Sequence, residues 1–115
     1  MKEYLLIFRN DAQDNMRAAN PEEMAVAMEQ WKNWMGKLAQ DGKFIAGQPL
    51  APGGKFMKTQ TQITDAPLAE GKEVINGYVL MKAADYNEAV ELTKGCPIFG
   101  DEGTVEVREI AVLDM

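Results

Sequence analysis

The chain has 115 residues, of which 46% are hydrophobic and 26% charged, so it can build the core of one domain and is too apolar for a disordered tail. Its 12 basic and 18 acidic residues give a net charge of -6, which disfavours nucleic acid as a partner because phosphates repel an acidic surface. Histidine is absent and Cys96 is the single cysteine, which excludes histidine-based catalysis, an internal disulfide and the usual histidine or cysteine metal sites.

These counts lead to several expectations about the class of protein. A lone cysteine is typical of proteins from a reducing compartment, so we expect a cytoplasmic protein. We also expect that it holds no metal and no cofactor. No apolar run approaches the roughly 18 residues of a membrane span, and the N-terminus lacks a signal-peptide pattern, so we expect no membrane association. No linker divides the sequence, which predicts a single domain over residues 1–115.

The first elements in the chain are a strand and a long helix. Residues 3–9 form a short apolar run that ends at a polar cluster, which is typical of a central strand. Asn20 and the proline after it predict a helix start, and Glu23 occupies the capping-box position. The helix is expected over residues 21–40, with Gly42 as its C-terminal stop.

An apolar stripe follows this helix at spacings of four and three residues. It consists of Met24, Met28, Trp31, Met35 and Leu38. We interpret the stripe as the face buried in the core, with a pocket lining of adaptable methionines as the alternative. Trp34 lies beside the stripe, and we expect it at the edge of a dimer interface or of a ligand site.

The middle of the chain reads as a hairpin followed by a strong strand. Residues 43–50 predict a strand, residues 51–54 a turn, and residues 55–64 the hairpin partner of the first strand. A loop is expected over residues 65–71. Residues 74–83 are the clearest strand pattern in the chain.

The C-terminal part of the chain repeats the order of secondary-structure elements expected in the N-terminal part. Asp85 and Glu88 form a second capping box, and the helix that they begin is expected to end at Gly95. The following Cys96-Pro97 step breaks it, and the β-branched segment 104–113 predicts a closing strand.

This order predicts an α+β fold, a ferredoxin-like sandwich in which two helices cover one face of an antiparallel sheet. Val79 and Met81 share one face of their strand, whereas Tyr78 and Leu80 share the other, so both sheet faces carry apolar side chains. The face without helices then needs a cover, and we expect a homodimer that packs sheet on sheet.

Asp65 is the first candidate for chemistry. A carboxylate on a loop near a sheet face can act as a general acid or base if partial burial raises its pKa. The alternative is a turn in which the Asp65 side chain accepts a hydrogen bond from the backbone two residues on, and by residue physics alone this alternative is favoured.

Three further residues are candidates for substrate binding, in addition to Trp34. Arg9 and Arg108 come from the first and last strands and are expected to hold an anionic group, with an Arg108–Glu106 or a cross-strand ion pair as the alternative. Tyr78 is expected to orient a substrate with its phenol, with a core or interface role as the alternative. Cys96 is given no nucleophilic role, because a helix C-terminus disfavours the thiolate.

Several motifs taken together resemble one known family. They are Tyr4-Leu5-Leu6-Ile7-Phe8-Arg9-Asn10, Trp31-Lys32-Asn33-Trp34-Met35, Asp65-Ala66-Pro67-Leu68, Gly77-Tyr78, Cys96-Pro97-Ile98 and Gly103-Thr104-Val105-Glu106-Val107-Arg108-Glu109-Ile110. The combination resembles the YCII-related proteins, specifically their DGPF branch, from about residue 2 to residue 111.

This resemblance implies a dimeric α/β-barrel in which each subunit has a cleft. In the wider family it implies a catalytic histidine–aspartate pair, which this chain cannot form because it lacks histidine. The resemblance carries over only Asp65, which matches the aspartate of the branch's signature, and Ala66 and Leu68 replace the glycine and phenylalanine of that signature. Some members of the branch are associated with extracytoplasmic-function sigma factors, which implies a regulatory or accessory role.

Two functional hypotheses follow. The first is a dimer that binds a small molecule in a cleft near Asp65, or that docks a regulatory protein. The alternative is a cofactor-independent enzyme, of isomerase, lyase or monooxygenase type, in which Asp65 acts as general acid or base on a small polar or carboxylate-bearing substrate. The missing histidine and the altered motif favour the first hypothesis.

Overall fold

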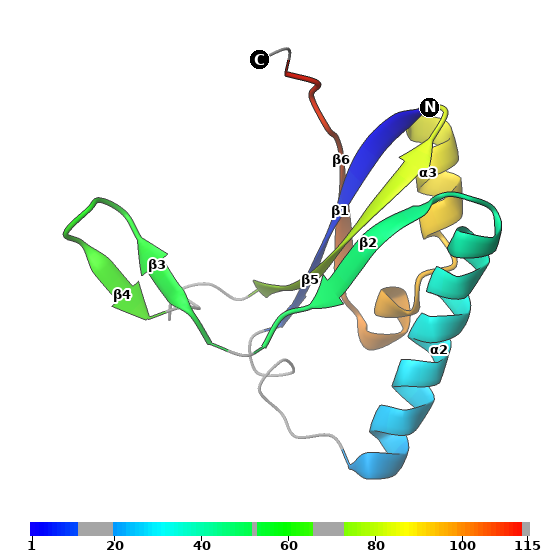
Figure 1. Cartoon of the computed structure of the whole chain (residues 1–115). Helices are drawn as coiled ribbons and strands as arrows, with labels where there is room; N and C mark the ends of the chain where they lie inside the picture. The colour runs from blue at the N-terminus through cyan, green and yellow to red at the C-terminus, as the bar shows by residue number, and fades with distance from the viewer. Residues whose placement is uncertain (12–19, 52, 66–72, 114–115) are drawn as a thin grey trace.

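A computed structural model describes residues 1–11, 20–51, 53–65 and 73–113. Its core is a four-stranded antiparallel sheet in the order β2–β5–β1–β6 (Figure 1). The elements, in chain order, are β1 (Lys2–Asp11), α2 (Pro21–Gln40), β2 (Phe44–Pro49), β3 (Lys55–Met57), β4 (Ile63–Asp65), β5 (Glu73–Ala83), α3 (Tyr86–Thr93), η1 (Pro97–Asp101) and β6 (Thr104–Glu109). This is the α+β, ferredoxin-like arrangement that the order of elements predicts, and its sheet does not close into a barrel within the described residues.

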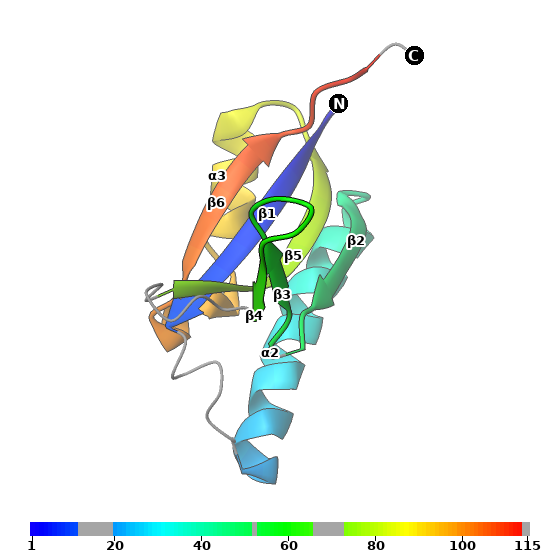
Figure 2. The ribbon, with the colours of Figure 1, turned by 90° about the vertical axis from the view of Figure 1, so that its left-hand side faces the viewer.

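Both helices lie on one side of the sheet (Figures 1 and 2). Along the strands, the buried side chains that face the helices alternate with side chains that face away from them, as expected for an antiparallel sheet covered on one face. The buried core consists of Tyr4, Leu6, Phe8, Trp34, Leu38, Val79, Met81, Ala83, Ala89, Cys96 and Ile98. Val105 and Val107 of β6 pack against it.

No helix of the described residues covers the opposite side of the sheet, and we call this side the open face. The register pairs Leu5 with Leu80 and Ile7 with Tyr78, and these four half-buried residues form its apolar centre. Arg108 stands opposite Leu5 on the other neighbouring strand. The open face therefore mixes apolar and charged side chains, as the strand alternation predicts.

Local capping sets the ends of α2. The Asn20 side chain accepts a hydrogen bond from the Glu23 backbone N–H at 2.8 Å, which confirms the predicted start. At the other end Gly42 has φ 71°, a conformation that glycine adopts at little cost.

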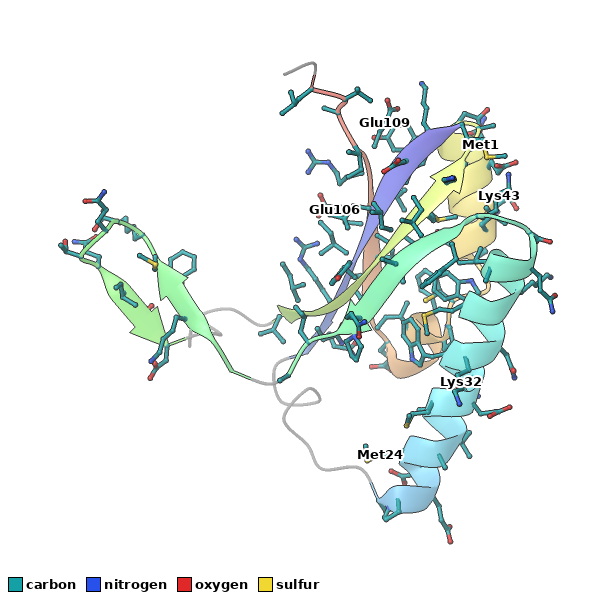
Figure 3. The ribbon with its side chains drawn as sticks, viewed as in Figure 1. Met1, Met24, Lys32, Lys43, Glu106 and Glu109 are labelled. Atoms are coloured by element: carbon teal, nitrogen blue, oxygen red, sulfur yellow. The ribbon has the colours of Figure 1, made fainter. Side chains whose placement is uncertain are left out.

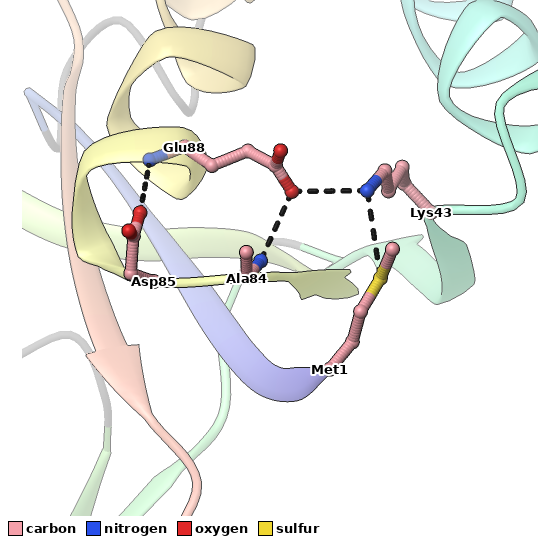
Figure 4. Close-up of polar contacts among 5 residues, drawn as sticks. All are labelled: Met1, Lys43, Ala84, Asp85 and Glu88. Atoms are coloured by element: carbon pink, nitrogen blue, oxygen red, sulfur yellow. Dashed lines mark hydrogen bonds and ion pairs between the residues drawn. The ribbon is translucent and has the colours of Figure 1, made fainter.

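The second helix is held at its start by two acidic side chains. Asp85 caps α3 by accepting a hydrogen bond from the Glu88 N–H at 2.8 Å. Glu88 in turn accepts hydrogen bonds from the Ala84 N–H at 3.0 Å and from Lys43 Nζ at 2.9 Å (Figure 4). These contacts lower the pKa of Glu88, the Lys43 hydrogen bond first and the Ala84 hydrogen bond second. They also tie α3 to the start of β2.

The apolar stripe of α2 is buried along only part of its length. Leu38 is buried and Trp31 and Met35 are half-buried, but Met24 and Met28 are 52% and 59% exposed. Figure 1 shows why: the N-terminal half of α2 extends beyond the sheet, so nothing within the described residues covers it. The expectation that the whole stripe is buried is therefore wrong at its N-terminal end.

Residues 55–64 do not pair with β2, contrary to the expected hairpin. Instead β3 and β4 pair with each other in a separate two-stranded sheet, with Lys55 opposite Asp65. This hairpin projects from the open side of the main sheet, away from the helices (Figures 1 and 2). Phe56, Met57 and Ile63 are exposed on it. A two-stranded ribbon alone is marginally stable in water, so this hairpin lacks the support that a packed sheet provides.

Some expected features lie outside the described residues. They are the polar cluster from residue 12 onward and the expected loop from Ala66 to Gly71, which includes both replaced positions, Ala66 and Leu68. Among the helices of the described ranges, none combines the length and apolar character that a membrane crossing needs.

Candidate functional site

Asp65 lies at the end of β4, on the projecting hairpin. Its carboxylate pairs with Lys55 Nζ across the hairpin, and its side chain is 84% exposed. It lines neither of the two hollows described below. Asp65 is thus an exposed partner in a surface ion pair within one chain.

Arg9 and Arg108 are brought together on the open face, as expected, but they share a protein carboxylate. Arg9 Nη1 lies 2.8 Å from Glu106 Oε1, and Arg108 Nη1 lies 3.0 Å from Glu106 Oε2. Hydrogen bonds from Arg108 and then from Arg9 lower the pKa of Glu106, whose position is marked in Figure 3. Both oxygens of Glu106 are engaged, so this trio corresponds to the ion-pair alternative.

Trp34 lies in the core. Its indole N–H donates a hydrogen bond to the Leu92 carbonyl at 3.0 Å, and its ring packs at right angles to those of Trp31 and Phe8. Trp34 also lines an open groove of about 670 Å³ between α2 and the α3–η1 segment. Its main contribution within the subunit is therefore to join the two helices.

A second, more apolar hollow lies between the middle of α2 and the ends of β2 and β5, and we call it the α2 cavity. Its volume is about 430 Å³, within the range of small-molecule sites. Its lining consists of Phe8, Met28, Trp31, Lys32, Met35, Gly47, Gln48, Pro49, Leu50, Asn76, Gly77, Tyr78 and Val79. Of the expected substrate-binding residues, Tyr78 is the one that borders it.

The helical side of this cavity is an aromatic and thioether surface. Met28, Trp31 and Met35 recur at helical spacing and face the same direction. The Trp31 ring stands edge-on to Phe8 at 5.2 Å and to Trp34 at 5.8 Å, so neighbouring rings hold its orientation. A rigid indole beside flexible methionines suits a flat apolar ligand.

Two glycines shape the opposite wall. A Cβ on Gly47 would lie 2.9 Å from Val79 Cγ2, and a Cβ on Gly77 would lie 3.1 Å from the Gln48 carbonyl oxygen. The close approach of β2 and β5 therefore favours glycine at both positions. Gln48 and Asn76 also line this wall.

Sequence reasoning identified this cavity only in part. The stripe with Met28, Trp31 and Met35 was interpreted as core, and a pocket lining was the weaker alternative. Gln48 and Asn76 lie in none of the motifs, and Lys32 lies in the segment from Trp31 to Met35 but was given no binding role. The available signal was a glycine inside each of two strands, Gly47 and Gly77, because such glycines mark a close approach of backbone or ligand.

Comparison with known proteins agrees with the sequence motifs. The family model for the YCII-related domain matches residues 3–114, nearly the whole chain. The chain belongs to the YCII-related family. A search of curated proteins found no match to it.

The charged groups of this YCII-related protein are not arranged as a metal site in the part that the structure describes. No three residues among its cysteine, aspartate and glutamate side chains come together there as ligands.

Proposed function

We propose that this YCII-related protein, with the motifs of the DGPF branch, is a homodimer that binds a small apolar molecule in the α2 cavity. The observation that supports binding most directly is the cavity itself. It presents a fixed indole and two methionines beside the buried Phe8, although burying the indole and the methionines fully would have stabilised the subunit. Apolar surface with a few polar residues is the usual composition of a ligand site.

A second copy of the chain supplies the cover that the open face lacks. Leu5, Ile7 and Leu80 lie at its centre, and the exposed hairpin projects on the same side. Sheets that pack face to face would bury both features together, because the hairpin extends past its own sheet toward any molecule on that face.

The enzymatic alternative with Asp65 as general acid or base lacks a supporting contact. Its carboxylate is exposed and paired with Lys55, and Asp65 does not line the α2 cavity. A role for Asp65 thus stays a prediction, as does a regulatory protein partner.

A thermal-shift screen of metabolites tests the proposed function. A ligand at 100 times its Kd stabilises the folded state by about 2.7 kcal/mol, and binding next to Trp31 should change the tryptophan fluorescence. Met28→Ala should weaken binding, because Met28 lines the cavity. Met24→Ala is the matched control, since Met24 is similarly exposed one turn earlier and outside the lining. Equal effects of the two substitutions on every hit would place the ligand elsewhere and contradict the proposal.

A further inference from the structure

The α2 cavity has a single cation on its described lining. Lys32 follows Trp31 on α2, and Figure 3 shows it near the middle of that helix, where the lining residues lie. Its side chain is exposed to solvent as well as to the cavity. A lysine stem can lie along apolar surface while its ammonium group stays hydrated, and this places a positive charge at the cavity rim.

Lys32 is without a carboxylate partner among the described residues. Glu29, three residues earlier on the same helix, does not come within ion-pair distance, whereas Lys43 and Lys94 pair with glutamates at 2.9 and 2.7 Å. An ammonium group with no internal partner beside an apolar cavity is available to an anionic ligand.

We infer that the α2 cavity takes small molecules with an aromatic or aliphatic body and one carboxylate group, and that Lys32 is the residue that selects the anion. This inference rests on the proposed function and names its ligand class. The apolar body lies against Trp31, and the carboxylate lies at the rim beside Lys32.

A carboxylate fits the charge of the site better than a phosphate. One lysine balances one negative charge, and the described lining includes no arginine and no helix N-terminus to hold a second. The net charge of -6 also repels dianions more strongly than monoanions.

The test compares three probes that share a phenyl group and differ in charge: 3-phenylpropionate, 3-phenylpropionamide and 2-phenylethylamine. Affinity is measured by calorimetry, and the amide resonances of Gly47 and Gly77 report whether each probe enters the cavity. We expect the carboxylate to bind about threefold to tenfold more tightly than the amide, and the amine most weakly. The preference should decrease as salt is added.

Variants then assign the preference to one residue. Lys32→Gln should abolish both the carboxylate preference and its salt dependence while leaving affinity for the amide nearly unchanged. Lys37→Gln is the matched control, because it removes the same charge from the same helix at a residue that lines the other groove. It should leave the preference intact.

The outcomes separate the inference from the proposed function. Equal binding of the carboxylate and the amide in the cavity leaves the proposed function standing and overturns the inference. The inference is also overturned if the carboxylate preference survives Lys32→Gln, or if Lys37→Gln abolishes that preference too. Failure of all three probes to shift Gly47 or Gly77 contradicts both.

Discussion

Arg9 Nη1 lies 2.8 Å from Glu106 Oε1, an ion pair between residues 97 positions apart in the sequence. The pair crosses from β1 to β6, and Arg108 holds the second oxygen of the same carboxylate. It therefore links the first and last strands of the sheet on the open face. Charged side chains beside apolar ones on this face are tolerated because they are paired.

This ion pair predicts a pH dependence of stability. The pKa of Glu106 is lowered from 4.5, so the paired carboxylate stabilises the folded state above that pH, and the contribution is lost as pH falls through the folded-state pKa. Glu106→Gln should unfold at lower urea concentration than the wild type at neutral pH, with the gap closing below about pH 4.5. Glu29→Gln, without an ion pair in the described residues, is the control. A gap that stays constant with pH would contradict this assignment.

Two glycine substitutions are expected to act in opposite directions. Gly36 lies inside α2, and a Cβ there would meet no atom within 4 Å, so Gly36→Ala should stabilise the protein by about 0.5–1 kcal/mol. Gly103 is buried, and a Cβ there would lie 2.6 Å from Asn10 Oδ1, so Gly103→Ala should destabilise by about 1–3 kcal/mol. Urea denaturation measures both changes, and a stable Gly103→Ala variant would show that this packing is looser than described.

Cys96 should be unreactive in the native protein. Its side chain is 4% exposed, and burial raises its pKa to about 11, which leaves about one thiolate in a thousand at pH 8. Ellman's reagent should therefore label the folded protein slowly and the urea-unfolded protein rapidly and completely. Rapid labelling without denaturant would indicate that the segment between α3 and η1 opens readily.

The proposed dimer makes the open face sensitive to charge. Ile7→Glu places a carboxylate at the apolar centre of that face and should raise the dimer Kd at least about a hundredfold in sedimentation equilibrium. Val26→Glu makes the same change at an exposed position of α2, on the opposite side, and should leave assembly unaffected. Circular dichroism checks that both variants fold. A wild-type protein that sediments as a monomer at micromolar concentration would refute the dimer.

Local chemistry made much of this fold predictable. Asn20 and Asp85 specify helix starts because their side chains bond backbone groups only three residues away. The alternation along residues 74–83 likewise separated Val79 and Met81, which are buried, from Tyr78 and Leu80 on the open face. Each of these features depends on neighbours in sequence, so the sequence alone carries it.

Two features of the fold depended on the tertiary structure. Residues 55–65 alternate like a strand, but the pattern cannot say whether the partner is β2 or the segment's own second half, and the structure pairs β3 with β4. The stripe on α2 is regular from Met24 to Leu38, yet the N-terminal half of the helix extends beyond the sheet, so Met24 and Met28 are exposed.

The candidate site likewise depends partly on local sequence and partly on the tertiary structure. The sequence by itself determined the fold class, the helix starts and the two faces of the sheet, because backbone capping and strand alternation act over a few residues. Only the tertiary structure decided that Asp65 stands apart on a hairpin and that Phe8, Trp31, Lys32 and Gln48 meet around one cavity. These residues come from three separate elements, and no local rule sets the distance between elements; the packing of helix against sheet sets it.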